Sequence, residues 1–243
     1  MNVVALYRQG VRHPQAAACA ACEVRQSALF GVLDDEGLDR IHTRIESLAL
    51  PPDGIIHARG RAGEAVYTVR AGLVRFERFN ERGDRRIVRL AGRGDLIGQE
   101  ALLRRPCMDE AIACTAVELC RIPRTLIDEL GHQDGRLPYE LMQRLQHALE
   151  AAENWSAELC AGPARRRLLR LLVRLAEHAE ADGTIWLPRR DEIGAMLDMT
   201  VETASRLVSR LKGESILADV TLARTARVNL PALRMALRAA DAG

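Results

Sequence analysis

The sequence predicts an α+β fold with a strand-rich first half, a long central helix and a compact C-terminal segment. Three patterns predict it. Short apolar runs separated by glycines occupy about residues 48–122, as in an all-β sandwich, roll or barrel. A helical repeat of apolar residues follows Pro123, and residues 190–211 have the pattern of a helix, a tight turn and a second helix.

Composition places the chain among globular proteins. Its 243 residues suffice for two ordinary domains, and 48% hydrophobic with 28% charged residues argue against a disordered chain. The net charge of +2 does not by itself indicate nucleic-acid binding, but Arg and Lys exceed Asp and Glu after Gly162. The sequence has no apolar run of membrane-spanning length and no signal-peptide pattern, so we expect a cytoplasmic protein whose cysteines are thiols or metal ligands.

The first part of the chain divides into an arm and a sensory domain. Residues 1–30 form the predicted arm, which carries Cys19-Ala-Ala-Cys22. The sensory domain, predicted over residues 31–135, begins with a short helix for which Asp34 is the candidate N-cap. The apolar residues with helical spacing there are Leu38, Ile41 and Ile45. The predicted strands lie in the runs 54–56, 65–69, 73–76, 87–90 and 117–119.

A dimerisation helix is predicted over residues 136–161. Its apolar residues recur at alternating intervals of four and three, the a/d seam of a helix that pairs with a copy of itself or with another helix. These residues are Leu141, Leu145, Ala148, Ala152, Trp155 and Leu159. Packing against the chain's own domain is the alternative, but a strict period of about 3.5 residues with polar flanks favours dimerisation. The pair Gly162-Pro163 then breaks the helix.

The C-terminal domain, predicted over residues 162–243, contains a helix-turn-helix pattern. Asp191 and Glu192 favour the start of the first helix, and Asp198-Met199 supplies the turn. Thr200 is a good N-cap for the second helix. The expected inward stripe of that helix consists of Val201, Ala204, Leu207, Val208 and Leu211. Residues 220–228 follow as a hairpin-like wing.

The outward side chains of the second helix fit the chemistry of a DNA major groove. A carboxylate accepts from cytosine N4, a guanidinium donates two bonds to guanine, and a serine hydroxyl does either. Glu202 and Arg206 lie one turn apart near the helix start, where recognition helices meet base edges. Alone, they would be read as a surface ion pair, but the turn, the cap and the wing together predict DNA reading. The candidate DNA-binding residues are Thr200, Glu202, Thr203, Ser205, Arg206, Ser209 and Arg210.

These motifs resemble the bacterial regulators named for the cyclic-AMP receptor protein and the fumarate–nitrate reduction regulator, the CRP/FNR family. The resemblance covers about residues 19–230. Its strongest motif, Thr200-Val-Glu-Thr-Ala-Ser-Arg-Leu207, is close to the recognition helix of the fumarate–nitrate branch, and Gly94-Asp-Leu-Ile-Gly98 is similar to a turn found across the family. The resemblance implies a double-stranded β-roll of the cyclic-nucleotide-binding type, a long dimer helix and a winged helix-turn-helix.

The same resemblance implies a function. Family members are transcription regulators and not enzymes, and they act on DNA as homodimers together with RNA polymerase. In the fumarate–nitrate branch the residues that match Glu202, Ser205 and Arg206 read a TTGAT half-site. We therefore expect a palindromic operator of the TTGAT-N4-ATCAA type.

Cyclic nucleotide is the first of three effectors to consider. Family members that bind it carry a glutamate soon after the Gly-Asp-Leu-Ile-Gly turn, for the ribose, and an Arg-Ser pair for the cyclic phosphate. The matching positions here hold Gln99, Asp109 and Glu110. Two carboxylates repel a phosphate and cannot donate to it. An offset alignment places Glu100 in the ribose role, but no arginine follows where the phosphate needs one. We expect no binding of cyclic AMP.

An iron–sulfur cluster is the second candidate effector. The oxygen-sensing branch of the family holds a [4Fe–4S] cluster with a Cys-x2-Cys pair, a third cysteine six residues on, and a distant cysteine in the roll. Cys19 and Cys22 match the pair, and Cys120 matches the distant ligand. Ala28 occupies the third position and cannot ligate iron. Completion of the site would then fall to Cys107, Cys114 or a carboxylate.

The third possibility is a different signal: haem binding, a thiol–disulfide switch between the two arm cysteines, or another small molecule. His13 is a candidate haem ligand. Cys114 and Cys160 are more simply explained as small buried apolar residues. A cupin-type metalloenzyme remains a further reading of the roll, but such enzymes cluster His and Glu ligands, and the roll offers only His57 for this role.

Overall fold

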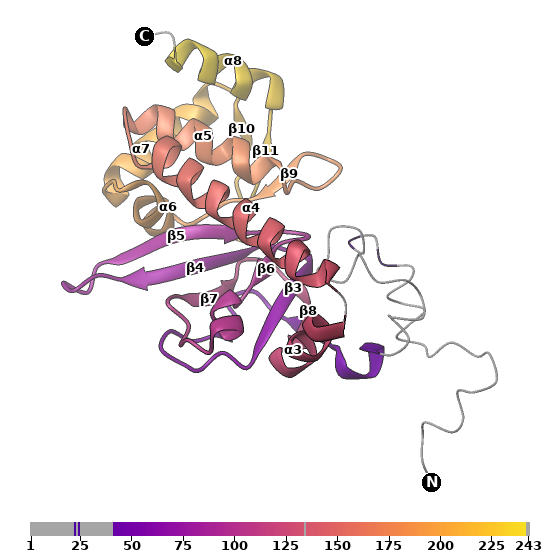
Figure 1. The fold of residues 1–243 in the computed structure, drawn as a ribbon. Helices are drawn as coiled ribbons and strands as arrows, with labels where there is room; N and C mark the ends of the chain where they lie inside the picture. Colours follow the sequence, from indigo (N-terminus) through magenta and orange to yellow (C-terminus); the bar gives the residue numbers. More distant parts are fainter. Residues whose placement is uncertain (1–21, 23, 25–40, 134, 242–243) are drawn as a thin grey trace. The chain divides into compact units, whose positions relative to one another are not determined.

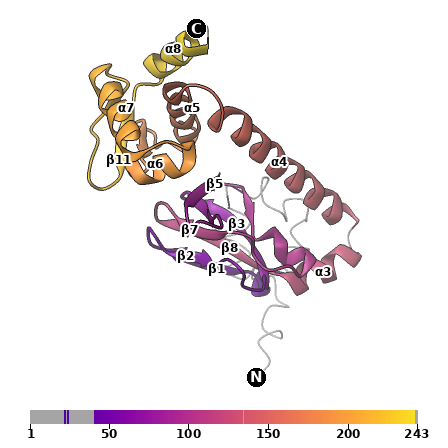
Figure 2. The same ribbon diagram turned by 90° about the vertical axis from the view of Figure 1, so that its left-hand side faces the viewer.

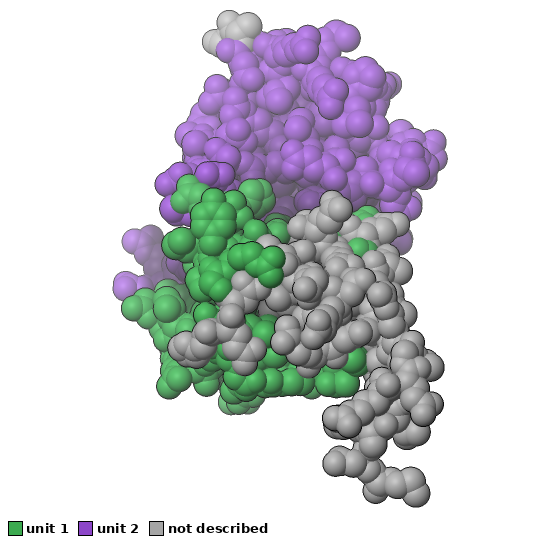
Figure 3. All heavy atoms as spheres, turned by 45° about the vertical axis from the view of Figure 1, so that its right-hand side comes forward, with its two compact units in different colours: residues 1–74, 91–148 green, residues 75–90, 149–243 purple. Residues whose placement is uncertain are grey.

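The computed structural model describes residues 22, 24, 41–133 and 135–241 (Figure 1). Four residues of the sequence hypotheses, Cys19, Ala28, Asp34 and Leu38, lie outside the described residues, as does His13. The chain divides into two compact units (Figure 3). Unit 1 comprises residues 1–74 and 91–148, and unit 2 comprises residues 75–90 and 149–243.

The first sheet of the β-roll is antiparallel, with the strand order β1-β8-β3-β6. Its strands are β1 (Glu46–Leu50), β3 (Ala65–Ala71), β6 (Leu96–Ile97) and β8 (Val117–Pro123). In the register of the sheet, Cys120 of β8 lies between Ser47 of β1 and Thr68 of β3. The pairing of β3 with β8 shifts between Val69 and Ala71, and Arg70 lies at this irregularity.

The second sheet has the strand order β2-β7-β4-β5. Its strands are β2 (Ile55–His57), β4 (Val74–Phe79), β5 (Arg85–Ala91) and β7 (Glu110–Ala113). Strands β4 and β5 form a hairpin, which we call the β4–β5 hairpin. Its tip is closed by a backbone hydrogen bond from Gly83 N–H to Asn80, and Gly83 has the positive φ of 82° that glycine adopts without strain. The two sheets confirm the predicted β-rich N-terminal fold.

The core of unit 1 joins the first sheet to the helices at its ends. These are the 3-10 helices η2 (His42–Arg44) and η3 (Gln99–Leu103) and the α-helix α3 (Arg124–Gln133). Buried members of this core include Val66, Ile122, Leu126, Leu130 and Leu137. In the described part of the predicted first helix, Ile41 is α-helical and the short helix η2 follows it, before strand β1 begins at Glu46. Ile41 and Ile45 are buried in this core.

Unit 2 contains the two predicted helices of the helix-turn-helix, two further helices and a small sheet. The helices are α5 (Ala164–Ala176), α6 (Arg190–Leu197), α7 (Val201–Gly213) and α8 (Leu230–Asp241). Figure 2 shows α5, α6 and α7 grouped together, and their buried residues include Leu168, Leu172, Ile193, Val208 and Leu211. The sheet has the order β10-β11-β9, with β9 (Thr184–Trp186), β10 (Leu217–Ala218) and β11 (Thr225–Val228). Its β10–β11 hairpin forms the wing, and β9 is a strand that the sequence analysis did not identify.

The longest described helix is α4 (Arg136–Leu159), which follows α3 in the chain. It is followed by Gly162, whose φ is 85°, and by Pro163 at the N-cap of α5, so the predicted break is present. Within the described residues, no helix is both long and apolar enough to cross a membrane.

Residues 75–90 lie in unit 2, whereas the predicted domain ranges place them in the sensory domain. The physical reason is a set of charged contacts from Arg75, Arg85 and Arg86 to the region of α6.

Candidate nucleic-acid interface

Helices α6 and α7 are joined by a tight turn at Asp198 and Met199. Asp198 has a left-handed backbone with φ 54°, and its N–H donates to the Gly194 carbonyl. A side chain on Gly194 would place its Cβ 2.6 Å from the Met199 carbonyl oxygen, so this close approach requires glycine. The Thr200 hydroxyl accepts from Thr203 N–H at 3.3 Å. The predicted helix, turn and capped second helix are therefore confirmed.

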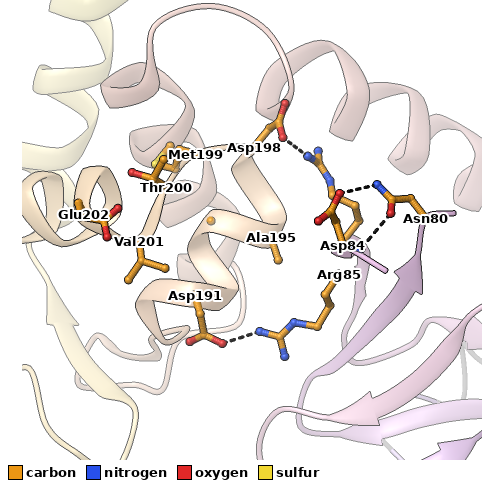
Figure 4. A pocket seen from close by; sticks show the side chains of 12 residues that line it. Asn80, Asp84, Arg85, Asp191, Ala195, Asp198, Met199, Thr200, Val201 and Glu202 are labelled. Carbon is orange, nitrogen blue, oxygen red and sulfur yellow. Dashed lines mark hydrogen bonds and ion pairs between the residues drawn. The ribbon is translucent and has the colours of Figure 1, made fainter. Parts of the chain in front are cut away.

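One face of α7 packs inward and the other is exposed. Ala204, Val208 and Leu211 are fully buried and Leu207 is half-buried. Val201 is 47% exposed, so the prediction that it faces inward is wrong. As the first residue of the helix it lines a cavity (Figure 4). Of the candidate DNA-binding residues, Thr203 is half-buried, and the exposed ones are Thr200, Glu202, Ser205, Arg206, Ser209 and Arg210.

The charged side chains of this face differ in how tightly neighbouring residues hold them. The pKa of Glu202 is lowered because its carboxylate accepts from its own backbone N–H and from the Thr200 hydroxyl and lies near the charge of Arg206. Arg206 Nη2 is 3.5 Å from the Thr203 hydroxyl, at the limit of hydrogen-bond distance. Arg210, by contrast, is held by Glu214 at 2.8 Å. The face thus presents an ionised acceptor at Glu202 and a weakly held guanidinium at Arg206.

A buried carboxylate ties α6 to the wing. Glu192 is fully buried and accepts from the Arg189 backbone N–H at 2.8 Å. Its two oxygens also accept from Arg224, at 2.7 and 2.6 Å, and this guanidinium lies 5.0 Å above the ring of Trp186. The sequence predicts Glu192 only as a residue that favours the start of the helix. Its position three residues after the N-cap was the one available signal, because this is where a glutamate bonds back to the N-cap backbone.

In unit 1, two of the predicted sensor cysteines share one guanidinium. Burial disfavours the charge of Arg70, but Cys120, Cys22 and Glu118 together outweigh burial and raise the pKa of Arg70. Cys22 also shares a side-chain hydrogen bond with Arg70. The register of β3 and β8 explains the meeting, since Thr68, two residues before Arg70, lies opposite Cys120. Cys22 and Cys120 therefore both lie near Arg70, an arginine that sequence reasoning missed.

The described part of the chain supplies only part of a metal site. Among its residues no group of three or more His, Cys, Asp or Glu side chains could hold a metal ion. The donor chemistry of Cys22 and Cys120 fits iron, whereas Arg70 cannot ligate it. Cys19, the remaining predicted ligand, lies outside the described residues.

The other cysteines have different surroundings. Cys107 and Cys114 are buried, and burial together with Glu100 raises the pKa of the Cys107 thiol, which favours its neutral form. Cys160 is exposed, so its interpretation as a buried apolar residue is wrong. It follows Leu159, the last residue of α4, where the chain leaves the helix for the exposed Gly162-Pro163 break.

Two side chains at positions that would contact a cyclic nucleotide, Gln99 and Glu100, form hydrogen bonds within the chain. The Gln99 amide donates to the Leu96 carbonyl at 2.7 Å, and Glu100 accepts from Met108 N–H at 3.3 Å. Glu110 begins strand β7, directly after Asp109. The absence of cyclic-AMP binding stays a prediction.

The burial of α4 differs from the predicted seam. Trp155 and Leu159 are buried, and the Trp155 ring lies 6.0 Å from the guanidinium of Arg174 of α5. Leu141 packs on the core of unit 1 and Ala148 is half-buried. Leu145 and Ala152 are exposed. Beside Leu145, three further large apolar side chains of α4 that are outside the predicted seam are exposed: Tyr139, Met142 and Leu149.

Comparison with known proteins gives two family matches. A model described as "Cyclic nucleotide-binding domain" matches residues 48–134, and one described as "Crp-like helix-turn-helix domain" matches residues 166–235. The chain is 26% identical to a "Fumarate and nitrate reduction regulatory protein" of Vibrio cholerae, over 82% of each protein. It is 25% identical to an "Anaerobic regulatory protein" of Pasteurella multocida, over 82% of this chain and 76% of that protein. Among solved structures, FixK2 from Bradyrhizobium japonicum matches with a TM-score of 0.70 and 25% identity, over 82% of this chain and 98% of FixK2.

Proposed function

Because the chain belongs to the CRP/FNR family of DNA-binding transcription regulators, we propose that it binds a palindromic operator of the TTGAT-N4-ATCAA type as a homodimer. We further propose that oxygen or redox state controls this binding. The site of action is the cytoplasm, and RNA polymerase is a further partner. The family consists of transcription regulators and not enzymes.

One observation carries the operator proposal: Glu202, Ser205 and Arg206 are exposed together on the first two turns of α7, directly after the tight turn. The first turns of a recognition helix meet the base edges in the major groove. The ionised Glu202 carboxylate can only accept hydrogen bonds, as from cytosine N4, and the Arg206 guanidinium can donate two bonds to a guanine. This is the combination that a TTGAT half-site and its complementary strand offer.

We expect Arg206→Ala to weaken binding to the palindrome by about 1–3 kcal/mol and to relax the preference at one base pair in each half-site. The measurement is fluorescence anisotropy on the palindrome, on single-base variants and on a scrambled duplex. Arg210→Ala is the matched control, because Arg210 is already engaged by Glu214 and should affect all duplexes alike. An equal loss on every duplex for Arg206→Ala would identify it as a phosphate contact.

The homodimer proposal rests on α4. Met142, Leu145 and Leu149 are 61%, 43% and 53% exposed, and Ala152 is exposed beside them. Their intervals of three, four and three residues are those of a coiled-coil seam, and water is a poor environment for such a stripe. A second copy of α4 would cover the stripe and supply the two-fold symmetry that a palindrome requires. The proposed seam is therefore this exposed stripe, which shares Leu145 and Ala152 with the predicted one.

The sensor proposal is supported by Cys22 and Cys120, both of which lie close enough to Arg70 to influence its charge. Cys19, Cys22 and Cys120 would hold an iron–sulfur cluster, which would supply an oxygen-labile centre. Arg70 would offset the negative charge of thiolate ligands there. A thiol–disulfide switch of these cysteines is the alternative, and it needs no iron.

We expect protein isolated without oxygen to contain iron and acid-labile sulfide, and both to be lost in Cys22→Ser and in Cys120→Ser. The reason is that each serine removes a thiolate ligand. Cys160→Ser is the matched control, since Cys160 is exposed and outside the cluster set, and it should retain the iron. Iron-free wild-type protein would rule out the cluster, and mass spectrometry of the oxidised protein would then test for the disulfide.

A further inference from the structure

The β4–β5 hairpin and the helix-turn-helix line opposite sides of an open cavity of about 770 Å³ within unit 2 (Figure 4). One wall comes from the hairpin, through Asn80, Asp84, Arg85 and Arg86. The other comes from α6, from the turn and from the first residues of α7, and it includes Glu202. The hairpin therefore stands beside the end of α7 that is proposed to read DNA.

Two ion pairs hold α6 to the hairpin, one at each end of the helix. Arg85 binds Asp191 in the first turn of α6 at 2.5 Å. Arg86 binds Asp198, the residue that ends α6 and begins the turn. Figure 4 shows Arg85 reaching from the hairpin to Asp191 of α6. Because they hold both ends of a short helix, they fix its orientation relative to the hairpin.

The buried charges nearby would keep their partners if the hairpin moved away. On the hairpin, the buried Arg75 donates to Glu77 at 2.7 Å. On the other side, Glu192 has its hydrogen bonds from Arg224 and the Arg189 backbone. Between the two groups the Arg75–Glu192 separation is 3.9 Å, longer than a hydrogen bond. Separation would thus break the two exposed ion pairs and the longer Arg75–Glu192 contact, and it would leave each buried charge with a hydrogen-bonded partner.

DNA reading conflicts with the hairpin in this position. In a helix-turn-helix complex the first helix crosses the DNA backbone while the second lies in the major groove. The groove is about 12 Å wide and bordered by a phosphate strand on each side. A cavity of about 770 Å³ has the size of a small-molecule pocket. The hairpin wall of this cavity therefore stands beside Glu202, where a phosphate strand that borders the groove would run.

We propose that the β4–β5 hairpin is an autoinhibitory latch, closed through Arg85–Asp191 and Arg86–Asp198, which must open before α7 can read its operator. This inference rests on the proposed function. Both pairs are partly exposed, with 49% and 71% exposure at the two carboxylates, so each should change the ratio of closed to open protein only about two- to fivefold. A latch of this strength can be opened by an effector or by DNA itself.

Arg86→Ala is the decisive variant, because the latch and simple electrostatics predict opposite changes in the affinity for operator DNA. Removing a cation near DNA ordinarily weakens binding. Opening the latch should instead tighten operator binding about two- to fivefold. Asp198→Asn, which suits a left-handed backbone, should also tighten it, and adding Arg86→Ala to Asp198→Asn should then have little further effect. Arg82→Ala, with the same charge change at the exposed hairpin tip, is the control and should not tighten binding.

Hydrogen–deuterium exchange of residues 80–86 in the full chain without DNA gives an independent readout. We expect faster exchange in Arg86→Ala and Asp198→Asn than in wild type or Arg82→Ala. Unchanged exchange, or an Arg86→Ala protein that binds the operator no more tightly than Arg82→Ala, would overturn the latch. If wild type and all variants fail to distinguish the palindrome from a scrambled duplex, the proposed function fails, while the exchange result still decides whether the hairpin is latched.

Discussion

Leu145→Glu is expected to convert the proposed homodimer into a monomer. Burying a leucine side chain contributes roughly 1.5–3 kcal/mol, and a two-fold interface counts each substitution twice. The dimer dissociation constant should therefore rise by about a hundredfold or more, with further repulsion between the two carboxylates. Loss of operator binding should accompany the dissociation, because a palindrome needs both recognition helices. Analytical ultracentrifugation over a range of concentrations measures the effect.

His147→Glu is the matched control for this change. His147 is exposed on the same helix but lies away from the stripe of Met142, Leu145 and Leu149. It should leave the dimer and operator binding nearly unchanged. A Leu145→Glu protein that sediments as a tight dimer would show that α4 does not use this stripe.

Glu192→Ala is expected to destabilise unit 2 by about 3–5 kcal/mol, the usual consequence of removing one partner of a buried ion pair. Arg224 would lose its carboxylate while its side chain is only 15% exposed, and α6 would lose a bond at its first turn. Glu192→Gln should cost less, because the amide oxygen can still accept from the Arg189 backbone. Urea unfolding followed by tryptophan fluorescence is suitable, since Trp186 lies under the Arg224 guanidinium.

Glu177→Gln is the control, because Glu177 is an exposed residue just after α5 and its loss should change stability by no more than about 0.5 kcal/mol. A Glu192→Ala protein as stable as this control would show that the wing and α6 are held together without the buried carboxylate.

The sequence by itself determined the helix-turn-helix and most strands of the roll. Their signals are local. Thr200 caps the second helix by accepting a hydrogen bond from the backbone N–H of Thr203, three residues later. Gly194 permits the close approach at the turn, and glycines separate the short apolar runs of the strands. Such signals act over a few residues, so they need no knowledge of the rest of the fold. Val201 was misplaced because the apolar periodicity of a helix does not say what lies beside its first residue.

Only the tertiary structure decided which apolar stripe of α4 is exposed and which charged side chains form ion pairs. Two apolar stripes lie side by side on this helix, and a 3.5-residue repeat does not distinguish a face that packs on its own chain from one that awaits a partner. In this chain Trp155 and Leu159 are buried, whereas Met142 and Leu149 are exposed. The pairs Arg86–Asp198 and Glu192–Arg224 join residues far apart in the sequence, as does the meeting of Cys22 and Cys120. No local pattern encodes them, because Coulomb interactions depend on distances in space that the folded chain alone sets.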